Sequence, residues 1–220
     1  PQRSTEVPVD MTIISAADIK RSGAQDLPTI LGRVAGVDVL NFAASQSDVG
    51  IRGYNQARSP RLLVLINGRQ VYLDHFGYTD WNALPVQLSE IRQIEVVRGP
   101  NSAIFGFNAV SGVVNIITFN PKFDKVNAVE VRAGTNANTY ASAVTTLRLG
   151  DHLSVRLSGG AQHEDEWRRT GNVVLASQLH NPSTVQANID AVATITPKAQ
   201  LRFESSWSNS AGSQVISTFA

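Results

Sequence analysis

Hydrophobic and polar residues alternate through the second half of the chain with a period of two, which is the spacing of side chains on β-strands. The alternation covers five segments, at residues 126–134, 140–149, 153–162, 185–196 and 200–208. Segments of about 9 to 12 residues are long enough for tilted strands to cross a bilayer. Alternation alone is equally typical of a soluble β-sandwich, in which one face of each strand meets a core.

The connections between these segments favour a membrane barrel over a sandwich. Gly-Asp at 150–151 and Pro-Lys at 197–198 predict tight turns, whereas residues 164–184 form a long polar excursion. Short turns on one rim and long loops on the other are typical of outer-membrane barrels. The short connection 135–138 falls on the rim that should carry long loops, so both architectures stay open at this point.

The first half, up to about residue 120, mixes short helices with short strands and predicts a small α+β globule. Ser15 and Asp18 match a capping box for a helix that Gly23 ends, and Asp26 is the expected N-cap of a second helix that Gly36 stops. Strands are predicted at 9–14, 37–40, 62–66, 69–73, 91–98 and 113–119, the third and fourth joined as a hairpin by an Asn-Gly turn.

Composition excludes several classes of function. Lys and Arg total 19, and Asp and Glu total 18. The chain therefore lacks the basic excess that is typical of a nucleic-acid binder. The absence of cysteine excludes disulfides, Cys-ligated zinc and thiol catalysis. No apolar run predicts a membrane-spanning helix, and residues 1–10 show no signal-peptide pattern. The sequence contains no G-x-S-x-G elbow for a catalytic serine and no glycine motif that binds phosphate. The His and acidic residues at 163–166 do not have the spacing of a metal site. We therefore expect no enzymatic activity, no bound metal and no cofactor.

The densest motif lies at residues 91–118, which read I-R-Q-I-E-V-V-R-G-P-N-S-A-I-F-G-F-N-A-V-S-G-V-V-N-I-I-T. It resembles the plug signature of TonB-dependent outer-membrane receptors, in which I-E-V-(I/V)-R-G-P precedes S-(A/x)-L-Y-G and A-x-x-G-(V/x)-(I/V)-N-I-I-T. Upstream segments keep the family's order: 12–20 resembles its opening V-I-S-A-x-D-I, 27–39 its first helix and strand, 50–53 its I-R-G step, and 63–69 its V-L-(I/V)-(D/N)-G strand. The chain departs from the pattern at Ala35, where proline is common, and at Phe105, where tyrosine is usual.

The resemblance implies a fold in two parts. An α+β plug domain, with a small mixed sheet and short helices, would occupy residues 1–120, and residues 121–220 would form the first five or so antiparallel strands of a transmembrane β-barrel of roughly 22 strands. Five strands cannot close such a barrel, and an open sheet edge is not viable in hydrocarbon, so we expect the chain to be part of a larger protein. The TonB box is not recognisable in residues 1–8 and is expected upstream of residue 1.

The resemblance also implies a function, which is TonB-dependent active import of a scarce solute across the bacterial outer membrane, with the plug gating the barrel lumen. The expected partners are TonB with its inner-membrane energising complex, outer-membrane lipid, and a small-molecule or metal-chelate substrate. A ferric siderophore is the default substrate because that class is common. The alternatives are a ligand-sensing signal transducer of the same family and a passive barrel subunit of a larger outer-membrane complex.

Two sets of residues are candidates for function. The resemblance implies that Arg52 and Arg98, in the two R-G steps, pair with glutamates on the inner barrel wall and lock the plug; pairing inside the plug, for example with Glu95 or Asp48, is the alternative. The ligand-binding set lies on loops expected to face the cell exterior, at 43–48, 54–60 and 72–81. It consists of Asn55, Gln56, Arg58, Tyr72, Tyr78 and Trp81. For Trp81 the alternative is that it covers the plug's core.

Overall fold

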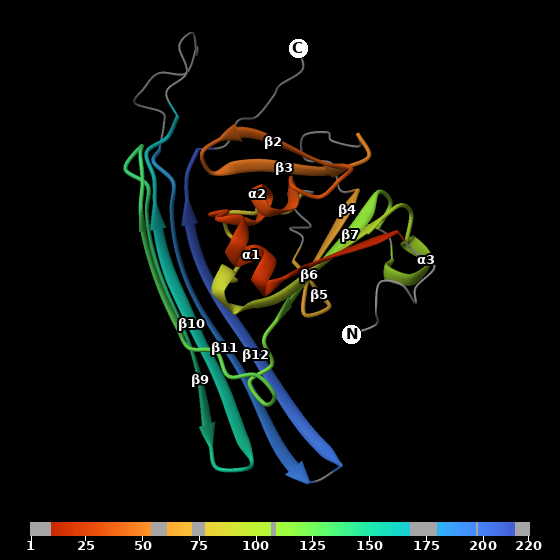
Figure 1. Cartoon of the computed structure of the whole chain (residues 1–220), viewed down its shortest axis with the longest axis vertical. Helices are drawn as coiled ribbons and strands as arrows, with labels where there is room; N and C mark the ends of the chain where they lie inside the picture. The colour runs from red at the N-terminus through yellow and green to blue at the C-terminus, as the bar shows by residue number, and fades with distance from the viewer. Residues whose placement is uncertain are drawn as a thin grey trace. The chain divides into compact units, whose positions relative to one another are not determined.

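The computed structural model of this chain describes residues 10–53, 61–71, 78–106, 109–167, 180–196 and 198–213. The chain forms two compact units, and most of their elements are labelled in Figure 1. The first, called the α+β unit, contains the residues up to 42 together with 47–81 and 91–118. The second, called the strand unit, contains residues 43–46, 82–90 and 119–220.

The α+β unit is built on a five-stranded mixed sheet in the order β1-β6-β7-β4-β5. Its strands are β1 (Met11–Ser15), β6 (Ile91–Arg98), β7 (Gly112–Thr118), β4 (Leu62–Ile66) and β5 (Arg69–Gln70). β4 pairs with β7 in parallel, and the other pairs are antiparallel. Apolar side chains of β4, β6 and β7 form the core, in which Val64, Ile94 and Val114 are fully buried. Two of the inner strands, β4 and β7, are almost wholly apolar, as expected for strands that are covered on both faces.

Short polar signals set the ends of the first two helices, α1 (Ala16–Ser22) and α2 (Leu27–Leu31). Ser15 and Asp18 form the predicted capping box, in which the Ser15 backbone N–H donates to Oδ2 of Asp18 over 3.0 Å. Gly23 ends α1 in the left-handed conformation, with φ of 62°. Asp26 caps α2 through a 2.6 Å hydrogen bond from the Thr29 backbone N–H. These predictions are confirmed, except that α2 ends at Leu31, ahead of the predicted stop.

A hairpin replaces one of the predicted loops. β2 (Val37–Ala43) and β3 (Gln46–Ile51) pair with each other, so the prediction of a loop at residues 43–48 is wrong. Gln46, Ser47 and Asp48 carry no apolar alternation, and pairing with β2 rather than local propensity makes them a strand. The short helix α3 (Ser102–Phe105) and the 3₁₀ turn η1 (Leu88–Glu90) also gave no sequence signal, because one turn is too short to show a helical period.

The strand unit contains the five predicted strands in an antiparallel meander, ordered β12-β11-β10-β9-β8. They are β8 (Ala128–Ala133), β9 (Thr139–Leu149), β10 (Leu153–His163), β11 (Ser183–Thr196) and β12 (Ala199–Ala211). A turn joins β9 to β10, as the Gly-Asp pair predicts, whereas the predicted Pro-Lys turn includes Pro197, which lies outside the described residues. Across the described residues, no helix is both long and apolar enough to span a membrane.

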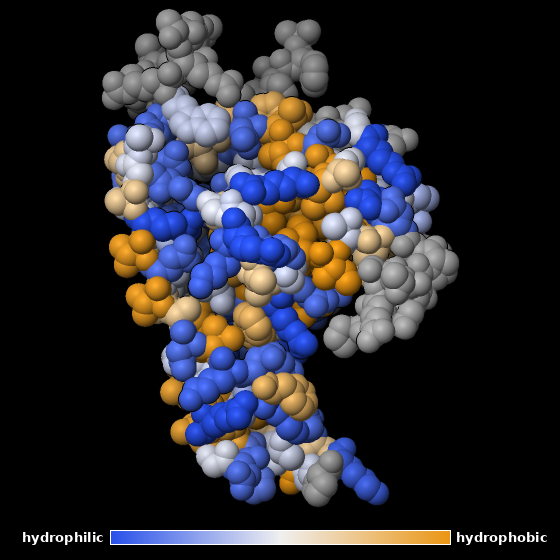
Figure 2. Space-filling model, in the orientation of Figure 1, coloured by the Kyte–Doolittle hydropathy of each residue, from blue (hydrophilic) through white to orange (hydrophobic). Residues whose placement is uncertain are grey.

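The meander buries its charged face and exposes its apolar face, which is the reverse of a soluble sheet. On one face, Arg156 and its cross-strand partner Asp190 are only 4 % and 2 % exposed. On the other face, Leu201 and Phe203 are 63 % and 57 % exposed. Figure 2 shows apolar side chains, in orange, projecting along one edge of the long strands. A soluble sandwich would bury the apolar face, so this arrangement favours strands whose apolar side meets lipid.

Gly112, at the start of β7, lies where the surrounding structure leaves no room for a side chain. A Cβ atom at this position would lie 2.5 Å from Cδ1 of Ile51 and 2.5 Å from the Val97 carbonyl oxygen. We expect Gly112→Ala to destabilise the α+β unit by about 1–3 kcal/mol, the usual cost of overpacking a core. Hydrogen exchange of the β6 and β7 amides in the full-length protein would measure this loss.

Gly134→Ala is the matched control, since its nearest neighbour would be Cβ of Asn138 at 3.6 Å, an ordinary contact. If Gly112→Ala and Gly134→Ala leave β6 and β7 equally protected, the tight contact at Gly112 does not limit the packing of the sheet.

Candidate functional site

The two arginines of the R-G steps meet at one carboxylate, that of Asp10, which directly precedes β1. Nε of Arg98 donates to Oδ2 of Asp10 over 2.9 Å, and Nη2 of Arg98 bonds to the other carboxylate oxygen. Nη2 of Arg52 lies 3.2 Å from the same Oδ2. The Arg98 backbone N–H also donates to the Asp10 carbonyl over 2.9 Å. We call this group of three residues the Asp10 clamp.

Unusual backbone conformations bring the two arginines together. Arg52 has a φ of 56°, in the left-handed region that non-glycine residues rarely adopt, and its N–H donates to the Gly36 carbonyl over 2.9 Å. Gly99, with φ of 101°, leaves space beside Nη1 of Arg52. Nη1 of Arg98 donates to the Ala35 carbonyl over 3.1 Å, which fixes the guanidinium group from a second side.

The charges of the Asp10 clamp stabilise each other. Hydrogen bonds from Arg98 hold the pKa of Asp10 below its ordinary value, and the same contact raises the pKa of Arg98. The Asp10 side chain is 48 % exposed, whereas that of Arg98 is 15 % exposed. Solvent therefore screens the interaction, which makes it a contact that can open and close at low cost.

Arg52 and Arg98 pair inside the plug, as the alternative interpretation expected, but their shared partner is Asp10, which was not one of the examples it named. Glu95 instead accepts hydrogen bonds from the side-chain amides of Gln93 and Asn115. Pairing of the two arginines with barrel glutamates stays a prediction, because it concerns strands beyond those of this chain.

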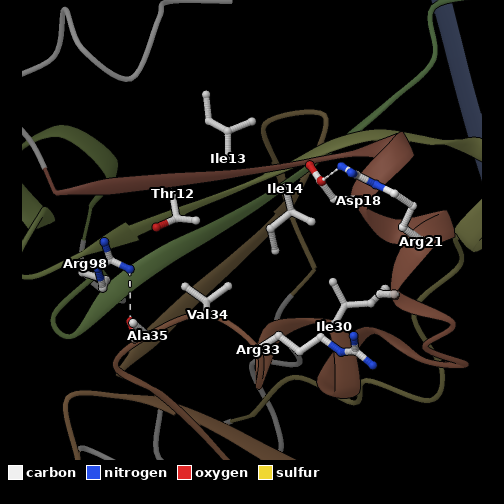
Figure 3. A pocket seen from close by; sticks show the side chains of 11 residues that line it. Thr12, Ile13, Ile14, Asp18, Arg21, Ile30, Arg33, Val34, Ala35 and Arg98 are labelled. Carbon is white, nitrogen blue, oxygen red and sulfur yellow. Dashed lines mark hydrogen bonds and ion pairs between the residues drawn. The ribbon is translucent and has the colours of Figure 1, made fainter.

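A groove of about 650 Å³ lies beside the Asp10 clamp, between β1, α1 and the turn that follows α2. Figure 3 shows Ile14, Ile30 and Val34 around its centre, with Arg33 and Arg98 at its margins. Arg21 is held at its edge by Asp18, its partner three residues earlier on α1. The groove thus combines an apolar floor with a basic rim.

Most of the predicted ligand-binding set lies outside the described residues, namely Asn55, Gln56, Arg58 and Tyr72. Tyr78 and Trp81 are described, and they are 7 % and 8 % exposed. They offer little surface to a ligand in this conformation, and burial of Trp81 agrees with a role in covering apolar residues. Ligand binding by the set stays a prediction.

The strand unit contains a second charged site, which is buried and which sequence reasoning missed. Glu90, at the end of η1, is 1 % exposed. Its Oε1 accepts the Gln87 backbone N–H at 2.8 Å and the side-chain amide of Asn188 at 3.2 Å. Its Oε2 accepts the Ser158 hydroxyl at 2.7 Å and lies 3.2 Å from Nε of Arg156. Every oxygen of this carboxylate therefore has two donors.

The charges continue from Glu90 across three strands in alternating sign. Nη2 of Arg156 on β10 lies 3.5 Å from Oδ2 of Asp190 on β11. Arg202 on β12 makes two hydrogen bonds to Asp190, of 3.0 and 2.8 Å, and lies 2.7 Å from Glu204. We call this series the charge ladder. Burial raises the pKa of Glu90, while Arg156, Ser158 and the Gln87 N–H act in the opposite direction.

One sequence signal could have found part of the charge ladder. Arg156 and Asp190 lie in the middle of segments predicted to cross a membrane, where ionisable side chains are costly and face the interior. Glu90 carries no such signal, since its acidic side chain before a strand resembles any solvated residue.

Comparison with known proteins agrees with this geometry. Residues 3–113 match the family described as the TonB-dependent receptor plug domain. The vitamin B12 transporter BtuB of Vibrio vulnificus (strain CMCP6) is 30 % identical over 166 residues, which cover 74 % of this chain and 26 % of the transporter.

Solved structures share the fold. The FpvA–pyoverdine complex of P. aeruginosa superposes with a TM-score of 0.75 at 15 % identity, covering 94 % of this chain and 26 % of FpvA. The ferric enterobactin receptor PfeA of Pseudomonas aeruginosa, in complex with enterobactin, gives 0.65 at 25 % identity, covering 93 % of this chain and 33 % of the receptor. The chain thus spans between a quarter and a third of the length of these relatives.

Replacing the carboxylate of the Asp10 clamp tests its role in holding β1. We expect Asp10→Asn to lower the unfolding temperature of the α+β unit at neutral pH and low salt. Because the pKa of Asp10 is lowered in the folded state, its contribution is present above the ordinary pKa of 3.8 and is lost as the pH falls through the lower folded value. Calorimetry of the full-length protein across a pH series would measure it.

Asp151→Asn, at the exposed turn after β9, is the control and should leave the unfolding temperature unchanged. A loss from Asp10→Asn that is the same at every pH and salt concentration would contradict an electrostatic role.

Removing the charge of Glu90 should be more costly. Glu90→Gln keeps the volume but points an amide NH₂ at groups that are themselves donors, so we expect a loss of about 1–3 kcal/mol. Hydrogen exchange of residues 82–90 in the full-length protein would show it as faster exchange. Glu204→Gln, at the half-exposed end of the charge ladder, should cost at most about 1 kcal/mol, as surface ion pairs do. Equal losses of stability in the two variants would show that burial does not make the Glu90 carboxylate more important for stability than that of Glu204.

Proposed function

We propose an energy-coupled import function for this chain, which belongs to the family of TonB-dependent receptors. The full protein would carry a scarce solute across the bacterial outer membrane, with the plug gating the lumen of a barrel of roughly 22 strands. The observation that supports it most is the reversed meander, whose charged face is buried and whose apolar face is exposed, directly after a plug-family sequence. No chemical change of the solute is involved.

The Asp10 clamp suggests how a pull would enter the plug. We expect the TonB box upstream of residue 1, so a pulling force would reach the described chain first at Asp10 and β1. β1 is the edge strand of its sheet and has a single neighbour, β6. Its five residues are all only partly buried. A strand held on one side by five residue pairs and by a solvent-screened clamp costs little to displace.

The proposed partners follow from the same reading. TonB and its inner-membrane energising complex would supply the force, and outer-membrane lipid would cover the apolar face of the meander. The exposed apolar side chains available to lipid include Val129, Val131, Leu147, Leu149, Leu157, Ile195, Leu201, Phe203 and Trp207. The plug arginines Arg52 and Arg98 would also pair with barrel glutamates on later strands and so lock the plug.

The proposed substrate is a metal chelate or another small molecule, with a ferric siderophore as the default. Relatives named for vitamin B12, for a pyoverdine complex with Fe and for ferric enterobactin support this chemical class. The candidate ligand residues Asn55, Gln56, Arg58, Tyr72, Tyr78 and Trp81 would form the floor of the binding site beneath the barrel's outer loops.

Uptake measurements in cells test the function directly. A strain that expresses the full-length protein should accumulate labelled ferric siderophore or labelled cyanocobalamin, and deletion of TonB should reduce accumulation to the level of a strain without the receptor. The reason is that the plug closes the lumen unless it is pulled. Uptake of either solute that is unchanged without TonB, or after collapse of the proton gradient, would indicate a passive pore and contradict the proposal.

A further inference from the structure

The chain from Asn82 to Glu90, which we call the wall segment, leaves the α+β unit and then returns to it. Trp81 before the segment and Ile91 after it belong to the α+β unit, whereas the segment itself packs in the strand unit. It lies inside the region that matches the plug family, residues 3–113. A segment whose sequence matches the plug family therefore packs with the strands of the strand unit.

Side-chain amides join the wall segment to strands β9 and β11. Gln87, which is 3 % exposed, donates from Nε2 to Oε1 of Gln186 on β11 over 2.9 Å. Its Oε1 accepts the Tyr140 hydroxyl of β9, also at 2.9 Å. Asn82 donates to the Thr184 hydroxyl over 3.2 Å. Both polar ends of Gln87 are thus satisfied by strands rather than by the α+β unit.

The strand β10 has a recess that matches the Gln87 side chain. A Cβ atom at Gly160 would lie 2.5 Å from Oε1 of Gln87 and 3.0 Å from the Ala141 carbonyl oxygen. Glycine inside a strand weakens it, and it marks places where another group approaches closely. The absence of a side chain at Gly160 is what lets the Gln87 amide reach the strand surface.

The charge ladder fixes the end of the wall segment. The Glu90 carboxylate is enclosed by four donors, and its backbone carbonyl accepts the Phe119 N–H at 3.0 Å. Withdrawing Glu90 would leave the guanidinium of Arg156, 5 % exposed, beside Asp190 with part of its charge unpaired. The Asp10 clamp is different, because its carboxylate is half exposed and water can replace each of its partners.

We infer that the wall segment stays bound to strands β9–β11 while the rest of the plug is displaced during transport, so that the gating movement is confined to the α+β unit. The inference rests on the proposed function, since it concerns which part of the plug a pull displaces. Its physical basis is the difference between desolvated contacts at the wall segment and solvated contacts at β1.

Cysteine labelling in the full-length protein separates the two parts, since this chain has no cysteine of its own. Ser89→Cys reports on the wall segment and removes no hydrogen bond, because the Ser89 hydroxyl is buried without a partner among the described residues. Val96→Cys reports on the α+β unit, at a fully buried position of β6 that pairs with Thr12 of β1. Both variants are treated with a hydrophilic maleimide in energised cells and in cells de-energised with a protonophore.

Energising the cells should speed labelling of Val96→Cys by about tenfold and leave labelling of Ser89→Cys unchanged, as expected when one unit opens locally and the other does not. Equal acceleration at both positions would overturn the inference while supporting the proposed function. No acceleration at either position would overturn the proposed function, and the inference with it.

Filling the space at Gly160 tests whether its close contact with Gln87 holds the wall segment in place. Gly160→Ala in the Ser89→Cys background places a methyl group where the Gln87 amide lies, so energising the cells should now speed labelling of Ser89→Cys by about tenfold. Gly134→Ala, whose Cβ would meet only an ordinary contact, should leave it protected. If Ser89→Cys stays protected in both variants, the fit of Gln87 against Gly160 does not hold the wall segment and the inference is wrong.

Discussion

The structure of the strand unit depends on one constraint, which is that a charge removed from water needs an opposite charge and hydrogen-bond donors around it. Glu90, Arg156 and Asp190 are all nearly inaccessible, and each one neutralises its neighbour. None of the three could be buried alone. The face of the meander that carries them must therefore be covered by a segment that brings its own carboxylate, and residues 82–90 meet this requirement.

The same constraint explains why the meander looks inverted. Strands with charged residues at their centres cannot turn that face to lipid, where an ionisable side chain is costly. The charged face is enclosed and the apolar face is left outward, as in the exposed Leu201 and Phe203. Two kinds of electrostatic contact result. The core of the charge ladder is desolvated, whereas the carboxylate of the Asp10 clamp is half exposed to water.

Local signals predicted most elements of the fold. The alternation of residues 126–208 placed all five strands of the meander within three residues of their observed ends. Capping residues such as Ser15 and Asp26 predicted where the helices begin, because a cap acts within one turn of the chain. β3 was missed, since its polar residues form a strand only through their pairing with β2. The fold was thus predictable wherever the cause was local.

The sequence alone determined the periodicity, the helix starts and the resemblance of residues 91–118 to the plug family, all of which depend on neighbouring residues. Only the tertiary structure decided the partners of the charged side chains. Asp10 is 88 residues from Arg98, and Ser158 is 68 residues from Glu90, so no local pattern could pair them. The pairing depends on strand register and on which face is desolvated, and these are properties of the assembled sheets.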